Sequence, residues 1–303
     1  MAGMAAEWLT VRTGDGRDLE VLRDGPPDGR PLVFHSGTPS GAVEFPPITD
    51  AAVDRGWQLV TWSRPGYGAS TAYAGRTVAD VTTDTAAVLD HLGQDRFVTL
   101  GWSGGGPHAL ACAALMPDHC AAATSLAGVA PYPAEGLDWL AGMGPENVKD
   151  FELNLEALDG KPGSIAAFRK SLEDAAEEMA EVTGEQLADA YGGLIDEVDR
   201  AALIEDFAEM LATSFRRSVA SGVAGWYDDS LAFVKPWGFD LADITVPVSV
   251  WQGAHDLMVP YAHGTWLVAH IPGARAHLFD DEGHLSLVGQ LPRILDDLDD
   301  LAG

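Results

Sequence analysis

One serine in this chain has the neighbours that an enzymatic nucleophile requires. Residues 101–105 read Gly-Trp-Ser-Gly-Gly, with Ser103 at the centre and a glycine two positions away on each side. The apolar run before these residues predicts a strand, and the run ALACAAL after them predicts a helix. A serine at so sharp a turn adopts a strained conformation, and the glycines let the chain pass close to itself. We therefore predict that Ser103 is a nucleophile beside the N–H groups of a helix N-terminus; the alternative is a passive serine in a glycine-rich turn.

A serine hydroxyl needs a base, and the base needs an acid that orients it. Asp256 directly follows a strand candidate at residues 245–253, and His284 lies in a loop, beside a glycine, after another candidate at 274–280. Because the carboxyl ends of parallel strands meet at one edge of a sheet, we expect both side chains near Ser103. The alternatives are an aspartate that caps a turn and a structural histidine. Three neighbouring acids are expected to form a solvated turn: Asp280, Asp281 and Glu282.

An acyl-transfer site also needs N–H donors for the negative oxygen that develops on the substrate. Gly104 follows the nucleophile and is the expected first donor of this oxyanion hole. The second donor is expected from the loop HSGTP, which ends a strand candidate at residues 31–37. Thr38 is the favoured residue there and Gly37 is its rival, while the alternative for the loop is an ordinary turn.

The elements around these residues alternate between strand and helix patterns. This alternation extends from residue 31 to about 130, is lost in an acidic, helix-prone stretch at 131–240, and then resumes. We therefore predict an α/β core with a mostly parallel central sheet, built from residues 1–130 and 241–303, and a helical cap inserted at 131–240. The strands expected in the core are 31–37, 57–63, 96–103, 122–130, 245–253 and 274–280.

The cap is expected to cover Ser103 and to supply most of the apolar wall of a substrate pocket. Replacing it by a short linker is therefore expected to leave Ser103 reactive toward small activated esters. Trp102, next to the nucleophile, is the residue expected to contact the substrate.

Composition and charge limit the partners. The 303 residues carry a formal charge of −28, which repels phosphate backbones and anionic lipid headgroups. Neither nucleic acid nor a membrane is an expected partner, and the absence of a recognisable secretory signal favours a cytoplasmic protein that acts on a small molecule. Cys112 and Cys120 are expected to be buried, reduced thiols without metal-site spacing. No metal and no cofactor is predicted, and the oligomeric state stays open.

Several segments, in this order, resemble motifs of the α/β-hydrolase superfamily, in its capped branch of serine hydrolases. They are HSGTP, SRPGYGAS at residues 63–70, GWSGG, GAHDLMVP at 253–260 and EGH. The resemblance covers most of the chain outside the cap, and Ser63 stands where many members have aspartate. It implies the α/β-hydrolase fold and a catalytic triad of Ser103, Asp256 and His284. Haloalkane dehalogenases and epoxide hydrolases of this branch use an aspartate nucleophile, so the serine argues against both.

The favoured function is hydrolysis of a small carboxylic ester or lactone through an acyl-enzyme. The resemblance leaves two other hydrolytic functions open: an aminopeptidase like proline iminopeptidase, in which cap carboxylates hold the substrate ammonium, and hydrolysis of a carbon–carbon bond. Functions of another class are ligand binding without hydrolysis and cofactor-free lyase or oxygenase chemistry, because a fold does not determine a reaction.

Overall fold

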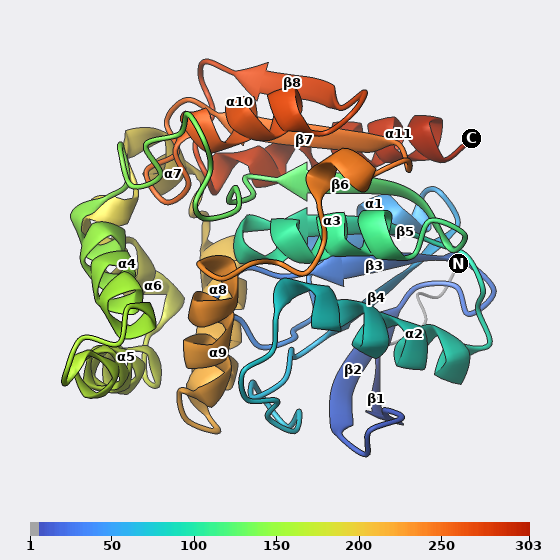
Figure 1. Cartoon of the computed structure of the whole chain (residues 1–303). Helices are drawn as coiled ribbons and strands as arrows, with labels where there is room; N and C mark the ends of the chain where they lie inside the picture. The colour runs from blue at the N-terminus through green and yellow to red at the C-terminus, as the bar shows by residue number, and fades with distance from the viewer. Residues whose placement is uncertain (1–5) are drawn as a thin grey trace.

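An eight-stranded sheet forms the centre of the computed structural model, which describes residues 6–303 (Figure 1). The strand order is β1-β2-β4-β3-β5-β6-β7-β8; the pairs β1–β2 and β2–β4 are antiparallel and the other neighbours are parallel. The strands are β1 (Glu7–Arg12), β2 (Asp18–Asp24), β3 (Arg30–His35), β4 (Trp57–Trp62), β5 (Phe97–Trp102), β6 (Cys120–Leu126), β7 (Val248–Gly253) and β8 (Arg275–Phe279). The predicted mostly parallel sheet is confirmed.

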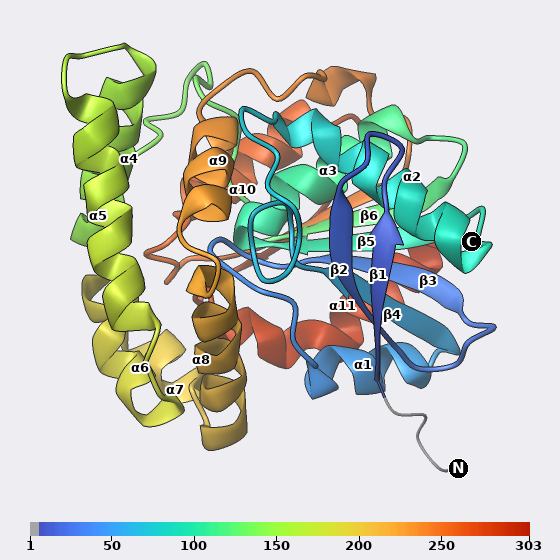
Figure 2. The same cartoon turned by 90° about the horizontal axis from the view of Figure 1, so that it is seen from below.

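Helices cover both faces of this sheet (Figures 1 and 2). The helices that flank it are α1 (Pro46–Val53), α2 (Val81–Leu92), α3 (Gly106–Leu115), α10 (Tyr261–His270) and α11 (Leu291–Ala302). Neighbouring residues of the central strands point to opposite faces, so Val33 packs in the cluster that contains residues of α2, α3 and α10, whereas Leu32 packs with residues of α1 and α11. Burial on both faces explains why these strands are continuous apolar runs in the sequence.

The sequence patterns did not predict three elements of the core, namely β1, β2 and α1. Strand β1 is the edge strand and β2 is its neighbour, and both carry charged residues that are exposed or half-buried, so they lack the apolar run of a central strand. The strand expected at 122–130 ends instead at Leu126, and Ala127 has a positive φ of 48° that strand geometry does not allow.

Six further helices gather at one end of the sheet, on the left of Figures 1 and 2. They are α4 (Pro145–Leu158), α5 (Ser164–Met179), α6 (Gly184–Ala190), α7 (Glu197–Ala202), α8 (Glu205–Val219) and α9 (Ala224–Phe233). They all belong to the segment 131–240, which we call the cap segment. Phe207 of α8 packs on Trp102 at the end of β5, with ring centroids 6.4 Å apart, so these helices lie against the end of the sheet that bears Ser103. None of the helices in residues 6–303 has the length and apolarity needed to cross a membrane.

Candidate active site

Ser103 lies at the junction of β5 and α3, with a positive φ of 57°. This left-handed conformation is costly for a residue with a side chain and is characteristic of functional sites. A Cβ atom added at Gly101 would collide with the carbonyl oxygen of Gly105, and one added at Gly105 would collide with the carbonyl oxygen of His35. The two glycines are therefore required for the turn that presents the serine.

His284 and Asp256 form a hydrogen-bonded pair, with 2.8 Å between Nδ1 and Oδ2, and each residue is 2% exposed. The carboxylate of Asp256 also accepts hydrogen bonds from the N–H groups of Met258 and Val259, at 2.9 and 2.7 Å, and from the amide of Gln252 at 2.9 Å. Met258 and Val259 bond Oδ1, whereas Gln252 bonds Oδ2, the oxygen that also binds the imidazole, and these three donors hold the carboxylate in one orientation. The structure thus brings together the two residues that the sequence predicted as base and acid, and adds Gln252, which it did not single out.

Trp102 joins this pair to the nucleophile, since it directly precedes Ser103. Its ring stacks on that of His284, with centroids 5.8 Å apart, and its indole N–H donates to the carbonyl oxygen of His284 at 3.3 Å. Burial lowers the pKa of His284, but the charge and hydrogen bond of Asp256, together with the charge of Asp199, outweigh burial and raise this pKa above its ordinary value.

The residues predicted for the oxyanion hole lie beside the nucleophile. A Cβ atom added at Gly37 would lie 3.3 Å from the Cβ atom of Ser103, and one added at Gly104 would lie 2.5 Å from the Oγ1 atom of Thr38. The loop after β3 and the first turn after β5 are therefore in direct contact. Both Thr38 and Gly37 remain candidates for the second donor.

Arg64, from the segment SRPGYGAS, determines how this loop is oriented. Its guanidinium donates to the carbonyl oxygens of Ser36 and Gly37, at 2.6 and 2.8 Å, and to the hydroxyl of Thr38 at 2.7 Å. Because the N–H of a trans peptide points opposite to its carbonyl, the N–H groups of Gly37 and Thr38 point away from Arg64. The loop thus has fixed peptide orientations before any substrate binds.

A buried aspartate from the cap segment neutralises this arginine. Asp229 of α9 is 0% exposed and accepts from Arg64 at 2.7 Å, from Arg76 at 2.6 Å and from the hydroxyl of Tyr67 at 3.0 Å. Burial raises the pKa of Asp229, but the two guanidinium groups lower it more, and the net shift is downward. The loop at residues 36–38 is therefore held by an ion-pair network that includes a residue of the cap segment.

A second aspartate of the cap segment holds the loop that carries His284. Asp199 of α7 is also 0% exposed and accepts from the N–H groups of His284, Leu285 and Ser286, at 2.9, 2.7 and 3.0 Å. Sequence reasoning missed both aspartates, because nothing in a run of cap residues distinguishes a buried acid from a solvated one. For Arg64 a signal existed, since its segment resembles a family motif.

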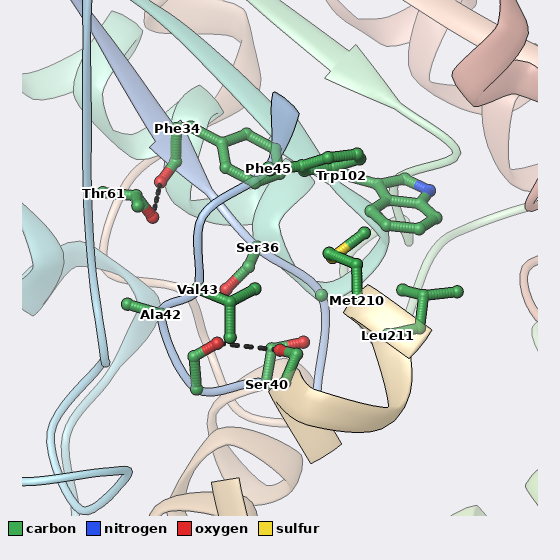
Figure 3. A pocket seen from close by; sticks show the side chains of 13 residues that line it. Phe34, Ser36, Ser40, Ala42, Val43, Phe45, Thr61, Trp102, Met210 and Leu211 are labelled. Carbon is green, nitrogen blue, oxygen red and sulfur yellow. Dashed lines mark hydrogen bonds between the residues drawn. The ribbon is translucent and has the colours of Figure 1, made fainter. Parts of the chain in front are cut away.

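A pocket opens beside Gly37 and Trp102 (Figure 3). Its lining is mainly apolar, with four hydroxyl groups: Phe34, Ser36, Gly37, Ser40, Gly41, Ala42, Val43, Phe45, Thr61, Trp102, Met210, Leu211 and Ser214. Only the last three belong to the cap segment. The loop at residues 36–45 supplies more of this lining than the cap segment does. Since neither Ser103 nor His284 lines this pocket, the expectation that the cap supplies most of the apolar wall of the substrate pocket stays a prediction.

The remaining polar candidates have other roles. Cys112 and Cys120 are free and buried, and burial raises the pKa of the Cys112 thiol to about 12. Glu282 accepts hydrogen bonds from the side chains of Ser286 and Gln290 within the histidine loop. Among residues 6–303, no three His, Cys, Asp or Glu side chains gather so that they could hold a metal ion.

Comparisons with known proteins agree with this architecture. A family model described as the alpha/beta hydrolase fold matches residues 30–289. The chain is 25% identical over 293 residues to a 2-hydroxy-6-oxononadienedioate/2-hydroxy-6-oxononatrienedioate hydrolase of Pseudomonas putida, covering 92% of this chain and 90% of that protein. It is 27% identical over 263 residues to a non-heme chloroperoxidase of Streptomyces lividans, covering 84% of each.

Among solved structures, the enol-lactonase of Burkholderia xenovorans LB400 has the same fold, with a TM-score of 0.67 and 19% identity over 97% of this chain and 99% of that one. The matched residues 30–289 include the turn at Ser103 and the pair of Asp256 and His284. Since the family model spans most of the sequence, this chain belongs to the alpha/beta-hydrolase fold family.

Proposed function

We propose that the chain is a serine hydrolase that cleaves a small, uncharged carboxylic ester or lactone. The observation that carries the proposal is the strained Ser103 at the end of β5, next to a tryptophan that stacks on the buried pair of His284 and Asp256. A hydroxyl, an imidazole and a carboxylate in this order form the arrangement that activates a serine for attack on a carbonyl.

In the proposed reaction, Ser103 attacks the substrate carbonyl while His284 accepts the hydroxyl proton. The N–H of Gly104 and an N–H of the loop held by Arg64 stabilise the negative oxygen of the tetrahedral intermediate. His284 then returns the proton to the leaving alcohol. In the second half of the reaction, His284 deprotonates a water that attacks the acyl-enzyme, and the acid leaves as Ser103 recovers its proton from His284. Asp256 keeps the Nδ1 proton facing its carboxylate, so that the other ring nitrogen faces the serine.

The pocket supports an uncharged substrate. None of the described residues that line it carries a charge, and its polar groups are hydroxyls and backbone. With a volume of about 30 Å³ and neither Ser103 nor His284 in its lining, this pocket does not itself hold a substrate, but it indicates apolar surroundings for Trp102. Apolar surroundings with few polar groups suit neutral acyl or alcohol groups.

Carbon–carbon bond hydrolysis is the second candidate, because the Pseudomonas putida relative is named as a hydrolase of an oxononadienedioate. A dioate carries two carboxylates, and a site for it needs cationic or strongly donating groups. Arg64 is engaged by Asp229 and by two loop carbonyls, so it does not serve as such a group. The uncharged pocket favours the ester or lactone.

An aminopeptidase is less well supported, since the substrate ammonium would need a carboxylate facing it. Two buried carboxylates of the cap, Asp199 and Asp229, are already fully engaged by backbone N–H groups and by guanidinium groups.

The test is a substrate panel with the Ser103→Ala variant beside it. We expect hydrolysis of short p-nitrophenyl esters or lactones in preference to aminoacyl amides and vinylogous diketones, and labelling of the wild type by a fluorophosphonate. Ser103→Ala should lower kcat/KM at least about a thousandfold and abolish labelling, because triad members act as a unit. Ser171→Ala, on α5, is the control that should change neither. Retention of more than about a tenth of the activity by Ser103→Ala would contradict the assignment of the nucleophile.

A further inference from the structure

Asp199 is the one cap residue whose side chain bonds directly to the backbone of the catalytic histidine. Its Oδ2 atom accepts from the N–H of His284 at 2.9 Å, and its Oδ1 atom accepts from Leu285 and Ser286 at 2.7 and 3.0 Å. These three consecutive N–H groups lie at the start of the short helical turn Ser286–Gln290, whose N-cap is Leu285, and have no helical carbonyl partner of their own. A carboxylate from a distant part of the chain thus replaces the usual local cap.

The surrounding residues fit this contact. Gly283 is required beside it, because a Cβ atom there would collide with the carboxylate of Asp199. Asp196 begins α7 by accepting from the N–H groups of Val198 and Asp199, at 2.9 and 3.3 Å, and its second oxygen bonds Nδ1 of His255 at 2.7 Å. Helix α7 is therefore anchored on the loop that carries Asp256 as well as on the loop that carries His284.

The carboxylate also acts on the imidazole through its charge. The charged groups that face His284 are Asp256, which bonds its ring, and Asp199, which bonds its backbone, and both raise the pKa of His284. Glu282 is engaged by Ser286 and Gln290, and Asp196 by His255. Burial raises the pKa of Asp199 above its ordinary value, and the three N–H donors and His284 reduce this shift without reversing it, since they favour the charged form.

We propose that Asp199 is a positioning residue for the base: it holds the backbone of His284 in the catalytic orientation and stabilises the imidazolium that forms during the reaction. The inference rests on the proposed function of Ser103, His284 and Asp256. Under this proposal, His284 acts as a base only when α7 is packed against its loop. The cap then contributes to the chemistry as well as to the pocket.

The test compares Asp199→Asn with Glu197→Gln, an equal change of charge at an exposed position of the same helix. The pKa of the His284 imidazole is followed by NMR, and the dependence of kcat/KM on pH is measured on a p-nitrophenyl ester. A neutral imidazole is the base, so activity falls as pH drops through the pKa of His284. Without the charge of Asp199, this pKa and the acid limb of the profile should both move to lower pH.

Asp199→Asn should also lower kcat, by up to about a hundredfold, with little change in KM, because the amide cannot accept all three N–H groups and the base is misplaced. Glu197→Gln should match the wild type in every measurement. A folded Asp199→Asn protein whose imidazole pKa and acid limb equal those of the wild type would overturn the proposal, even if its stability fell.

If Asp199→Asn does not fold, Gly283→Ala gives a second test, because its methyl group displaces the carboxylate of Asp199 without removing a charge. The pKa of His284 should again fall, and an unchanged value would overturn the proposal. The NMR titration needs no turnover, so its result stands apart from the proposed function, which fails if the wild type shows neither ester hydrolysis nor labelling at Ser103.

Discussion

Two loops flank Ser103. Each is held by a buried aspartate of the cap segment, but the two aspartates do so in different ways. The oxyanion loop at Ser36 to Thr38 is held by a guanidinium on its carbonyl oxygens, and Asp229 reaches it mainly through that guanidinium. The base loop at His284 to Ser286 is held by a carboxylate directly on its N–H groups.

This difference allows the effect of loop geometry to be distinguished from the effect of a nearby charge on the pKa of His284. Asp229 lies between Arg64 and Arg76, so its charge is balanced within a few ångströms and acts mainly to hold the network together. Asp199 has no cationic side chain bonded to it among the described residues, and the positive charge that acts on it is that of the His284 imidazole. We therefore expect the first aspartate to support the shape of the site, and the second to support both its shape and the pKa of the base.

The largest effect is expected when both contacts are removed at once, by replacing residues 131–240 with a Gly/Ser linker. From the sequence we expected such a protein to keep a reactive Ser103, but the contacts of Asp199 and Asp229 predict the opposite. Fluorophosphonate labelling should be slowed about a thousandfold or more, because the base and the oxyanion donors lose their supports together.

Circular dichroism must first show that the linker protein is folded. The full-length double variant Asp199→Asn with Asp229→Asn serves as the companion and should show the same loss. A folded protein of either kind that is labelled at the wild-type rate would refute the view that the cap supports the chemistry.

The two aspartates should also differ in stability. Asp229→Ala leaves the buried guanidinium of Arg64 without a counter-charge and leaves Arg76 only the more distant Asp228, at 3.6 Å, and it should lower the free energy of unfolding by about 3–5 kcal/mol. Asp199→Ala leaves backbone N–H groups without an acceptor and should cost about 1–3 kcal/mol. Urea unfolding measures both, with Glu197→Ala as an exposed control; equal costs would mean that Asp229 is not needed to compensate the arginines.

The smallest effect is expected where the core itself touches the base loop. Trp102→Phe keeps a ring that stacks on His284 but loses the indole N–H bonded to the carbonyl oxygen of His284. We expect kcat to fall about fivefold, in keeping with one neutral hydrogen bond, and the acid limb of the pH profile to stay in place. A shift of that limb comparable to the shift in Asp199→Asn would show that geometry alone sets the pKa of His284.

Much of the core could be predicted from the sequence because its determinants are local. Alternating apolar runs indicated the strands from β3 to β8, and glycines around Ser103 indicated the turn at which φ is positive. Asp256 and His284 followed from their place after strands, and the structure joins them at 2.8 Å. The antiparallel strands β1 and β2 were missed because incomplete burial leaves a weak and partly charged pattern.

What only the tertiary structure decided is the part played by residues far apart in the chain. Asp199 meets His284 across 85 positions and Asp229 meets Arg64 across 165. Both acids are among the 46 acidic residues of the chain, and they lie in a segment that looks like solvated helix. The steric requirements of a turn limit which residue types can stand next to it in the sequence. The burial of a carboxylate depends instead on which surface packs over it. The sequence therefore determined which groups can react, and the packing of the cap determined what holds them in place.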